Sequence, residues 1–138
     1  MVDRQIVPDL APPPGYAHVS SAPAGRLIMT AGAVPIDAEG QLVGRDDLTA
    51  QTRQTIRNLM RALEIAGATG EDVLKTTVYV VAVTGADLTA VWKAVQDSPI
   101  AAAASTLLGV SLLGYDGQLV EIEATQSSSE EGEAAFLE

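Results

Sequence analysis

Two glutamates, Glu121 and Glu123, stand two residues apart in the segment Leu119-Val-Glu-Ile-Glu-Ala124. Apolar residues alternate with polar ones through this segment, which is the period of a β-strand. The two glutamates therefore share one face of the strand, with Cα atoms roughly 6.5–7 Å apart. Such a pair can belong to a solvated or salt-bridged outer face. It can also turn a carboxylate into a cleft, where it positions water or moves a proton.

The other candidate catalytic or metal-binding side chains have no suitable partner residue near them in the sequence. The single histidine, His18, has no second imidazole with which to form a metal site, so we expect it to be packed or hydrogen-bonded. Cysteine is absent, which excludes a thiol nucleophile and cysteine-ligated metals. Ser105 and Thr106 have no base beside them, which disfavours a serine triad, and no glycine-rich phosphate loop occurs. We predict neither a metal nor a cofactor.

The charge balance limits the partners that the surface can attract. Eight Lys and Arg residues stand against 18 Asp and Glu, for a net charge of −10. Such a surface repels nucleic-acid phosphates and anionic membranes. The chain has no apolar run long enough to span a bilayer, and its polar start does not resemble a signal peptide. We expect a soluble cytoplasmic protein without nucleic-acid or membrane partners.

The elements that must position these residues form one predicted domain, residues 1–126, followed by an acidic tail, residues 127–138, that we expect to be disordered. Apolar residues make up 47% of the chain and aromatic residues 4%, so the core must be aliphatic. The N-terminal prolines predict an extended lead-in. Apolar and turn patterns then predict strands at 16–20 and 26–32, a helix from 48 to a stop at Gly67, a strand at 73–83, a helix over 88–95, and strands at 105–112 and 119–125.

The order β-β-α-β-α-β-β predicts an α+β layer in which two helices cover one face of a mixed sheet. The other face must then be buried elsewhere. A trimer packed sheet to sheet would bury it.

Five short segments, in order, resemble the Rid family, also known as YjgF or endoribonuclease L-PSP. They are Gly15-Tyr16, Ala31-Gly32, Gln51-Thr-Arg-Gln54, Lys75-Thr-Thr-Val78 and Val120-Glu-Ile-Glu-Ala124. The resemblance implies a chorismate-mutase-like fold and a homotrimer. It also implies clefts between subunits that bind a small-molecule metabolite.

The resemblance also implies a set of site residues. The first glutamate of Glu-Ile-Glu, which positions the hydrolytic water, corresponds to Glu121. Tyr16 corresponds to the tyrosine that lines the cleft, Gly32 to a glycine that offers main-chain contacts, and Thr106 to a residue that contacts ligand through its backbone.

Two positions depart from the family pattern. Ala104, followed by Ser105, stands where the family usually carries an arginine that clamps a carboxylate. Lys75 and Lys93 are the candidate replacement cations, and we expect both to be solvated. Trp92 stands where many members carry asparagine near the ligand. It belongs either to the apolar stripe of its helix or to the cleft, where an indole could stack on a planar ligand.

The implied activity is hydrolysis or related processing of an imine or enamine metabolite, with Glu121 activating water. Without the arginine we expect poor activity on small 2-imino acids and a better fit to a neutral, larger or aromatic substrate. The alternative is a non-catalytic trimer that binds a metabolite as a sensor or carrier, or that acts as a chaperone-like scaffold.

Overall fold

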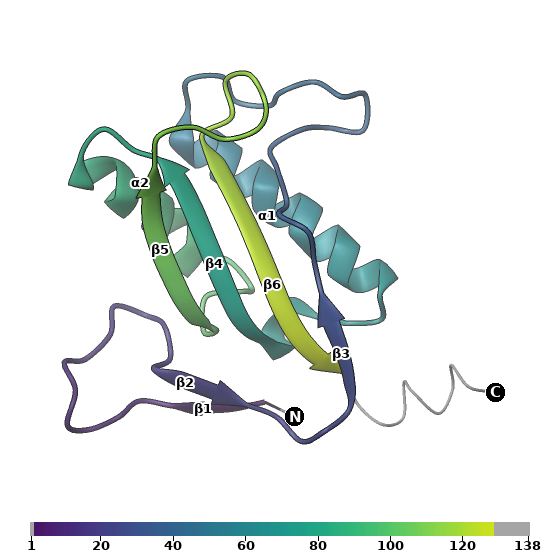
Figure 1. Cartoon of the computed structure of the whole chain (residues 1–138), viewed down its shortest axis with the longest axis vertical. Coiled ribbons are helices and arrows are strands. Elements are labelled where there is room, and N and C mark those ends of the chain that lie inside the picture. The colour runs from purple at the N-terminus through teal and green to yellow at the C-terminus, as the bar shows by residue number, and fades with distance from the viewer. Residues whose placement is uncertain (1, 129–138) are drawn as a thin grey trace.

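The computed structural model describes residues 2–128 (Figure 1). Four strands form one sheet in the order β3-β6-β4-β5, in which β4 and β5 are parallel and the other pairs antiparallel. Helices α1 and α2 cover one face of this sheet, as the α+β prediction requires. The elements are β1 (Asp3–Gln5), β2 (Val19–Ser21), β3 (Arg26–Met29), α1 (Leu48–Ile65), the short 3-10 helix η1 (Gly70–Asp72), β4 (Val73–Val81), α2 (Gly85–Gln96), β5 (Ala104–Val110) and β6 (Val120–Ser128).

The N-terminal region departs from the prediction. Residues 3–5 are not a lead-in, because β1 pairs antiparallel with β2 in a separate two-stranded sheet. The guanidinium of Arg4 fixes this ribbon to the main body, donating to Ser20 Oγ at 3.2 Å and to the carbonyl of Val73 at 3.0 Å. The strand predicted at 16–20 begins only at Val19, and Ala17 forms a single parallel bridge with Ala104.

Helix α1 follows its predicted pattern closely. Asp47 caps its first turn by accepting from the N–H of Ala50 at 3.0 Å, and Gly67 follows its end with a left-handed φ of 83°. Leu59 and Leu63 are fully buried against the sheet. The core that they join is aliphatic apart from Trp92, as the composition predicted.

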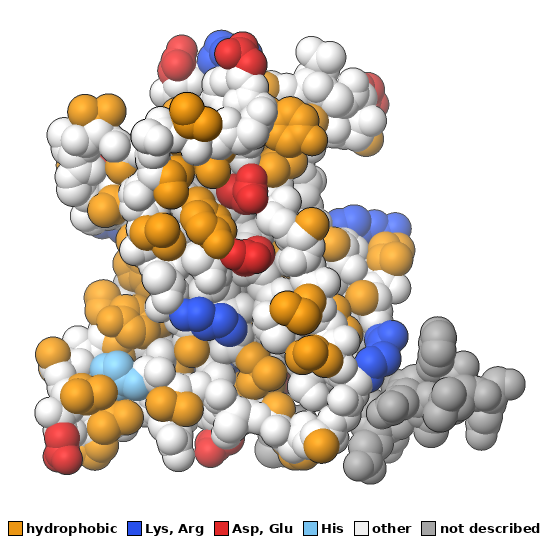
Figure 2. Space-filling view, in the orientation of Figure 1, with side chains coloured by type: hydrophobic (Ala, Val, Ile, Leu, Met, Phe, Trp, Pro, Cys, Tyr) orange, Lys and Arg blue, Asp and Glu red, His pale blue; other side chains and the backbone are white. Residues whose placement is uncertain are grey.

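The sheet face away from the helices, here called the open face, receives alternate side chains of β3, β4, β5 and β6. It carries Leu27 and Met29, which are 62% and 71% exposed, and also the side chains of Glu121 and Glu123. Figure 2 shows acidic and basic side chains among hydrophobic ones on this face. In the described chain, therefore, only one face of the sheet is covered.

The end of the domain also differs from the prediction. Strand β6 continues through Ser127 and Ser128, past the boundary expected at residue 126, because both residues pair with β3. Arg26 supports this extension by donating from Nε to Ser128 Oγ at 3.3 Å. The rest of the predicted tail, residues 129–138, lies outside the described residues. No helix in residues 2–128 has the length and apolar character needed to cross a membrane.

Candidate functional site

Glu121 lies on β6 with its carboxylate against Gly32. The chain after β3 runs beside β6, where the N–H groups and carbonyls of Ala33 and Ile122 bond reciprocally at 2.8 and 3.1 Å. A Cβ built on Gly32 would stand 2.1 Å from Glu121 Oε2. Only a glycine at position 32 leaves room for the carboxylate in this position. This explains why a glycine follows Ala31 in the Ala31-Gly32 segment.

Gln118 orients the Glu121 carboxylate. Its Nε2 donates to Glu121 Oε1 and to the carbonyl of Val120, both at 3.0 Å, and its Oε1 accepts from the N–H of Tyr115 at 3.1 Å. The side chain is 3% exposed, so its amide has a fixed position. The amide therefore holds one oxygen of the Glu121 carboxylate in place.

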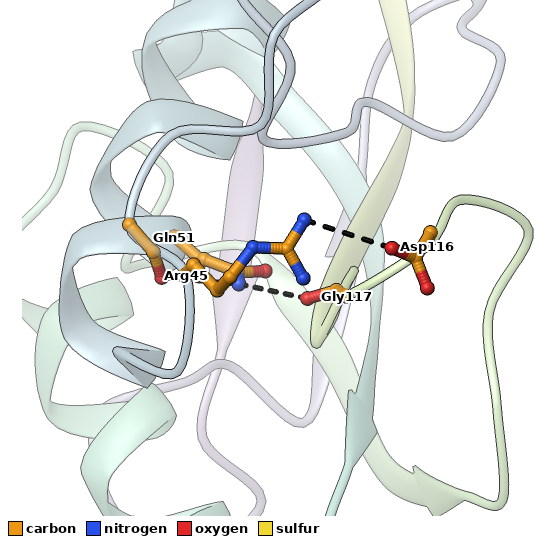
Figure 3. Close-up of polar contacts among 5 residues, drawn as sticks. Arg45, Gln51, Asp116 and Gly117 are labelled. Atoms are coloured by element: carbon orange, nitrogen blue, oxygen red, sulfur yellow. Dashed lines mark hydrogen bonds and ion pairs between the residues drawn. The ribbon is translucent and has the colours of Figure 1, made fainter.

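The loop that carries Gln118 is fastened to the start of α1 (Figure 3). Gln51, fully buried, donates to the carbonyls of Gly44 and Gly117 at 3.1 and 3.0 Å and accepts from the N–H of Leu119 at 2.7 Å. Arg45 adds an exposed ion pair with Asp116 at 3.7 Å. The hydrogen bonds of the buried Gln51 amide hold the loop more firmly than the Arg45–Asp116 pair, because exposed ion pairs contribute little to stability.

The second glutamate has a different partner. Tyr79, on β4, donates its hydroxyl to Glu123 Oε1. This hydrogen bond raises the pKa of Tyr79, and desolvation and the negative charges of Glu123 and Glu121 raise it further. Although the two carboxylates share a face, one accepts from an amide and the other from a phenol.

Ala104 lies on the same open face. Ala104 begins β5 opposite Lys75 of β4, and its N–H donates to Ser20 Oγ at 3.2 Å. Lys75 is exposed, and its Nζ donates to Thr106 Oγ1 at 2.7 Å. Lys75, Ala104 and Thr106 therefore form a second group of open-face residues, displaced along the sheet from Glu121.

The remaining predicted residues lie on the helix side of the sheet. Tyr16, Trp92 and Ser105, with Pro14 and Leu107, line a pocket of about 210 Å³. The rings of Tyr16 and Trp92 meet edge to face at 5.9 Å. Because neighbouring residues in a strand face opposite ways, Ser105 points away from the face that carries Thr106. Its Oγ accepts from Thr76 Oγ1 at 2.8 Å.

Trp92 packs in the core and also lines this pocket. Its ring is 9% exposed, and its Nε1 donates to the carbonyl of Pro14 at 2.7 Å. It lies in the apolar stripe of α2, and its contact with a ligand stays a prediction. Within one chain, the sheet separates Trp92, Tyr16 and Ser105 from Glu121.

Two further features stand apart from both groups. His18 is hydrogen-bonded, as expected, with Nδ1 accepting from the N–H of Val7 at 2.9 Å and Nε2 lying 3.1 Å from the carbonyl oxygen of Ala11. A groove of about 480 Å³ between α1 and α2 is larger than the pocket, but its basic residues, Arg53 and Lys93, lie on the helix side. Residues 2–128 bring no three histidine or carboxylate side chains together as a metal site.

Sequence reasoning missed Gln118 and Tyr79. Gln118 lies in a turn, where a glutamine carries no signal of its own, and only the three-residue spacing to Glu121 hinted at a contact. The Tyr79 side chain lies on the open face of β4, and Tyr79 pairs with Glu121 in the strand register. A strand-pairing prediction would have found it once the β4–β6 register was known.

The chain belongs to the endoribonuclease L-PSP family, whose model matches residues 9–127. A Rid-family protein of unknown function from Yersinia pestis, YyfB, superposes with a TM-score of 0.86 at 36% identity, covering 92% of this chain and 98% of that one. A RutC family protein of Pyrococcus abyssi is 37% identical over 79 residues, and the 2-iminobutanoate/2-iminopropanoate deaminase of Salmonella typhimurium is 32% identical over 79 residues. These matches cover 57% of this chain in each case, and 62% and 61% of the respective relatives' lengths.

Proposed function

We propose that this protein hydrolyses the C=N bond of an imine, or of the imine tautomer of an enamine, with Glu121 as the residue that activates water. The observation that carries the proposal is the fixed carboxylate of Glu121, held by the amide of Gln118 and given room by Gly32. The deaminase named for the Salmonella relative supports the reaction class.

The chemistry needs one base and one water molecule. Glu121 accepts a proton from water as the oxygen attacks the imine carbon, and it passes this proton to the nitrogen, which gives a neutral carbinolamine. Glu121 then takes the hydroxyl proton of the carbinolamine and delivers it to the amine nitrogen. The C=O bond forms as the C–N bond breaks, and ammonia leaves. A carboxylate that is already positioned lowers the barrier because the proton acceptor needs no rearrangement.

The test compares Glu121→Gln with Glu123→Gln, the same chemical change two residues away on the same face. We expect ammonia release to fall at least about 100-fold in Glu121→Gln, within the usual range for loss of a general base. We expect Glu123→Gln to keep activity within about fivefold. Equal losses in both variants, or activity retained in Glu121→Gln, would contradict the assignment.

The alanine at position 104 leads us to propose weak activity on 2-iminopropanoate and 2-iminobutanoate. Losing a bidentate guanidinium removes on the order of 2–5 kcal/mol from recognition of a desolvated carboxylate. Ala104→Arg should therefore raise kcat/KM for these two substrates. Wild-type turnover equal to that of an arginine-bearing relative would refute this part of the proposal.

We also propose that the working form is a homotrimer in which the open faces of the copies meet. The exposed apolar side chains Leu27 and Met29 on that face need cover. A second copy would also bring one chain's helix-side pocket and another chain's Glu121 within reach of one ligand. Light scattering should show a trimer, and Met29→Glu should dissociate it. Ile65→Glu, at an equally exposed site at the end of α1, should not.

A further inference from the structure

Three arginines follow one another along the exposed side of α1. Arg53, Arg57 and Arg61 stand four residues apart, so they lie on successive turns, and all three are exposed. Arg61 pairs with Glu64 at 2.8 Å, and Arg57 donates to Gln54 Oε1 at 2.7 Å. Among the described residues, no carboxylate forms an ion pair with Arg53 or Arg57. This arginine row therefore carries positive charge that the described chain leaves unpaired, in a protein of net charge −10.

The arginine row leads into the groove between α1 and α2. Arg53 lines this groove from α1, and Lys93 lines it from α2. The small apolar side chains of Ala90 and Ala94 also line it, and Asp97 is the carboxylate that faces the two cations there. The volume of about 480 Å³ has room for a large apolar side chain. A peptide that suits this surface carries carboxylates along the row and an apolar residue for the groove.

The chain beyond the described residues has this composition. Residues 129–138 read Ser-Glu-Glu-Gly-Glu-Ala-Ala-Phe-Leu-Glu. They contain four glutamates, no lysine or arginine, and the apolar pair Phe136-Leu137. The segment and the arginine row are therefore complementary in charge, and the apolar pair follows the first three glutamates as the groove follows the row.

The segment starts at the right place to reach this surface. Strand β6 ends beside the C-terminal end of α1 (Figure 1), where Arg26 donates from Nε to Ser128 Oγ at 3.3 Å and from Nη2 to the carbonyl of Ala66. At about 1.5 Å per helical residue, Arg53 lies about 20 Å from Ala66 along the axis of α1. At about 3.3 Å per extended residue, Phe136 can reach about 26 Å from Ser128. The segment is long enough to follow the row as far as the groove.

We propose that residues 129–138 dock on their own chain, with their glutamates along the arginine row and Phe136 in the groove between α1 and α2. The tether favours this contact, because a short flexible link gives the segment an effective concentration on the order of millimolar at the row. The inference depends on neither the hydrolase nor the trimer, because the row and the groove lie on the helix side, away from the open face. It gives an ordered place to a segment that the sequence predicts to be disordered.

Two introduced cysteines test the docking in the full chain, which has no cysteine of its own. One replaces Ala135, and the other replaces either Thr89, which lines the groove, or Thr69. Thr69 is the matched control because it is also an exposed threonine. It lies between Ala66 and Val73, which are both beside the end of β6, so an undocked segment meets it more readily than Thr89.

The rate of disulfide formation distinguishes a docked segment from an undocked one. At low ionic strength we expect Thr89→Cys/Ala135→Cys to form its disulfide within one chain at least about fivefold faster than Thr69→Cys/Ala135→Cys, because docking raises the local concentration at the groove. High salt should remove this preference, because salt screens exposed ion pairs. Faster linkage in the Thr69→Cys protein at low ionic strength overturns the inference. Disulfides that join two chains assign the segment to a neighbouring copy and overturn docking on its own chain.

Charge variants of the Thr89→Cys/Ala135→Cys protein test whether the arginine row holds the segment. Arg53→Gln/Arg57→Gln removes two charges from the row, and glutamine keeps nearly the helix propensity of arginine. Arg45→Gln/Lys75→Gln removes the same charge from positions outside the row. We expect the first change to slow the disulfide at least about fivefold and the second to slow it less than about twofold. Equal rates in the two variants overturn the role of the row, and with it the inference.

Discussion

Replacing Gly32 with alanine should disable the Glu121 carboxylate without unfolding the protein. The new Cβ would stand 2.1 Å from Glu121 Oε2, 2.5 Å from its Cδ and 2.7 Å from its Cγ. The φ of Gly32 is not in the left-handed region, so alanine fits the backbone itself. All three clashing atoms belong to the end of one flexible side chain, and that side chain is the part that will move.

The size of the displacement follows from these distances. Ordinary contact begins at 3.4 Å, so Oε2 must retreat by roughly 1.3 Å from its 2.1 Å position. A misplacement of about 1 Å can lower a rate about 100-fold, which corresponds to about 2.7 kcal/mol of transition-state stabilisation. We therefore expect kcat/KM for imine hydrolysis to fall by about two orders of magnitude. The free energy of unfolding should change by less than about 1 kcal/mol.

Gly114→Ala is the matched control, because a Cβ at Gly114 meets nothing within 4 Å. Ammonia release and thermal unfolding are measured for both variants beside the wild type. The reasoning fails if Gly32→Ala keeps full activity. It also fails if Gly32→Ala loses activity only in proportion to a large drop in melting temperature, because the defect would then be one of folding.

Two further predictions concern the supports of the site. Gln51→Leu removes the partner of three partly buried backbone groups, so we expect a loss of about 2–4 kcal/mol in the free energy of unfolding. Circular dichroism should then show a fall of about 10 °C in melting temperature, whereas Gln41→Leu, at an exposed position, should change little. Tyr79 has a raised pKa in the folded protein, so its protonated hydroxyl stabilises the fold below the unfolded pKa of about 10, and this contribution is lost as pH rises through the folded pKa. In Glu123→Gln the pKa of Tyr79 should fall, so the phenolate absorbance at 295 nm should appear at a lower pH than in the wild type. Tyr79→Phe is the control, because it lacks this absorbance change. If the absorbance change occurs at the same pH in Glu123→Gln and in the wild type, Glu123 is not the cause of the raised pKa.

The fold could be predicted where local pattern and burial agree. The apolar period of α1 reflects one buried stripe, and Gly67 marks the end of the helix because it adopts a left-handed φ. The alternation in β6 reflects one buried face. The pairing of β1 with β2 could not be predicted in the same way. Strand pairing depends on a partner more than a dozen residues away, and the three residues of β1 show little pattern of their own.

The structure divides the predicted site residues into two groups, and the sequence did not predict this division. Glu121 and Gly32 lie together because the segment after β3 runs beside β6. Tyr16, Trp92 and Ser105 are brought together on the other side of the sheet. Ser105 and Thr106 are neighbours on β5, so their side chains lie on opposite faces of the sheet. A list of site residues does not say which face each side chain occupies.

Lys75 cannot simply replace a guanidinium at position 104, although the two positions share the open face. A side chain growing from Ala104 would start on β5 and present a planar fork that binds two carboxylate oxygens. Lys75 starts on the neighbouring strand, carries a point charge, and already leans toward Thr106. It offers attraction without the fork's orientation, and from a different origin on the sheet.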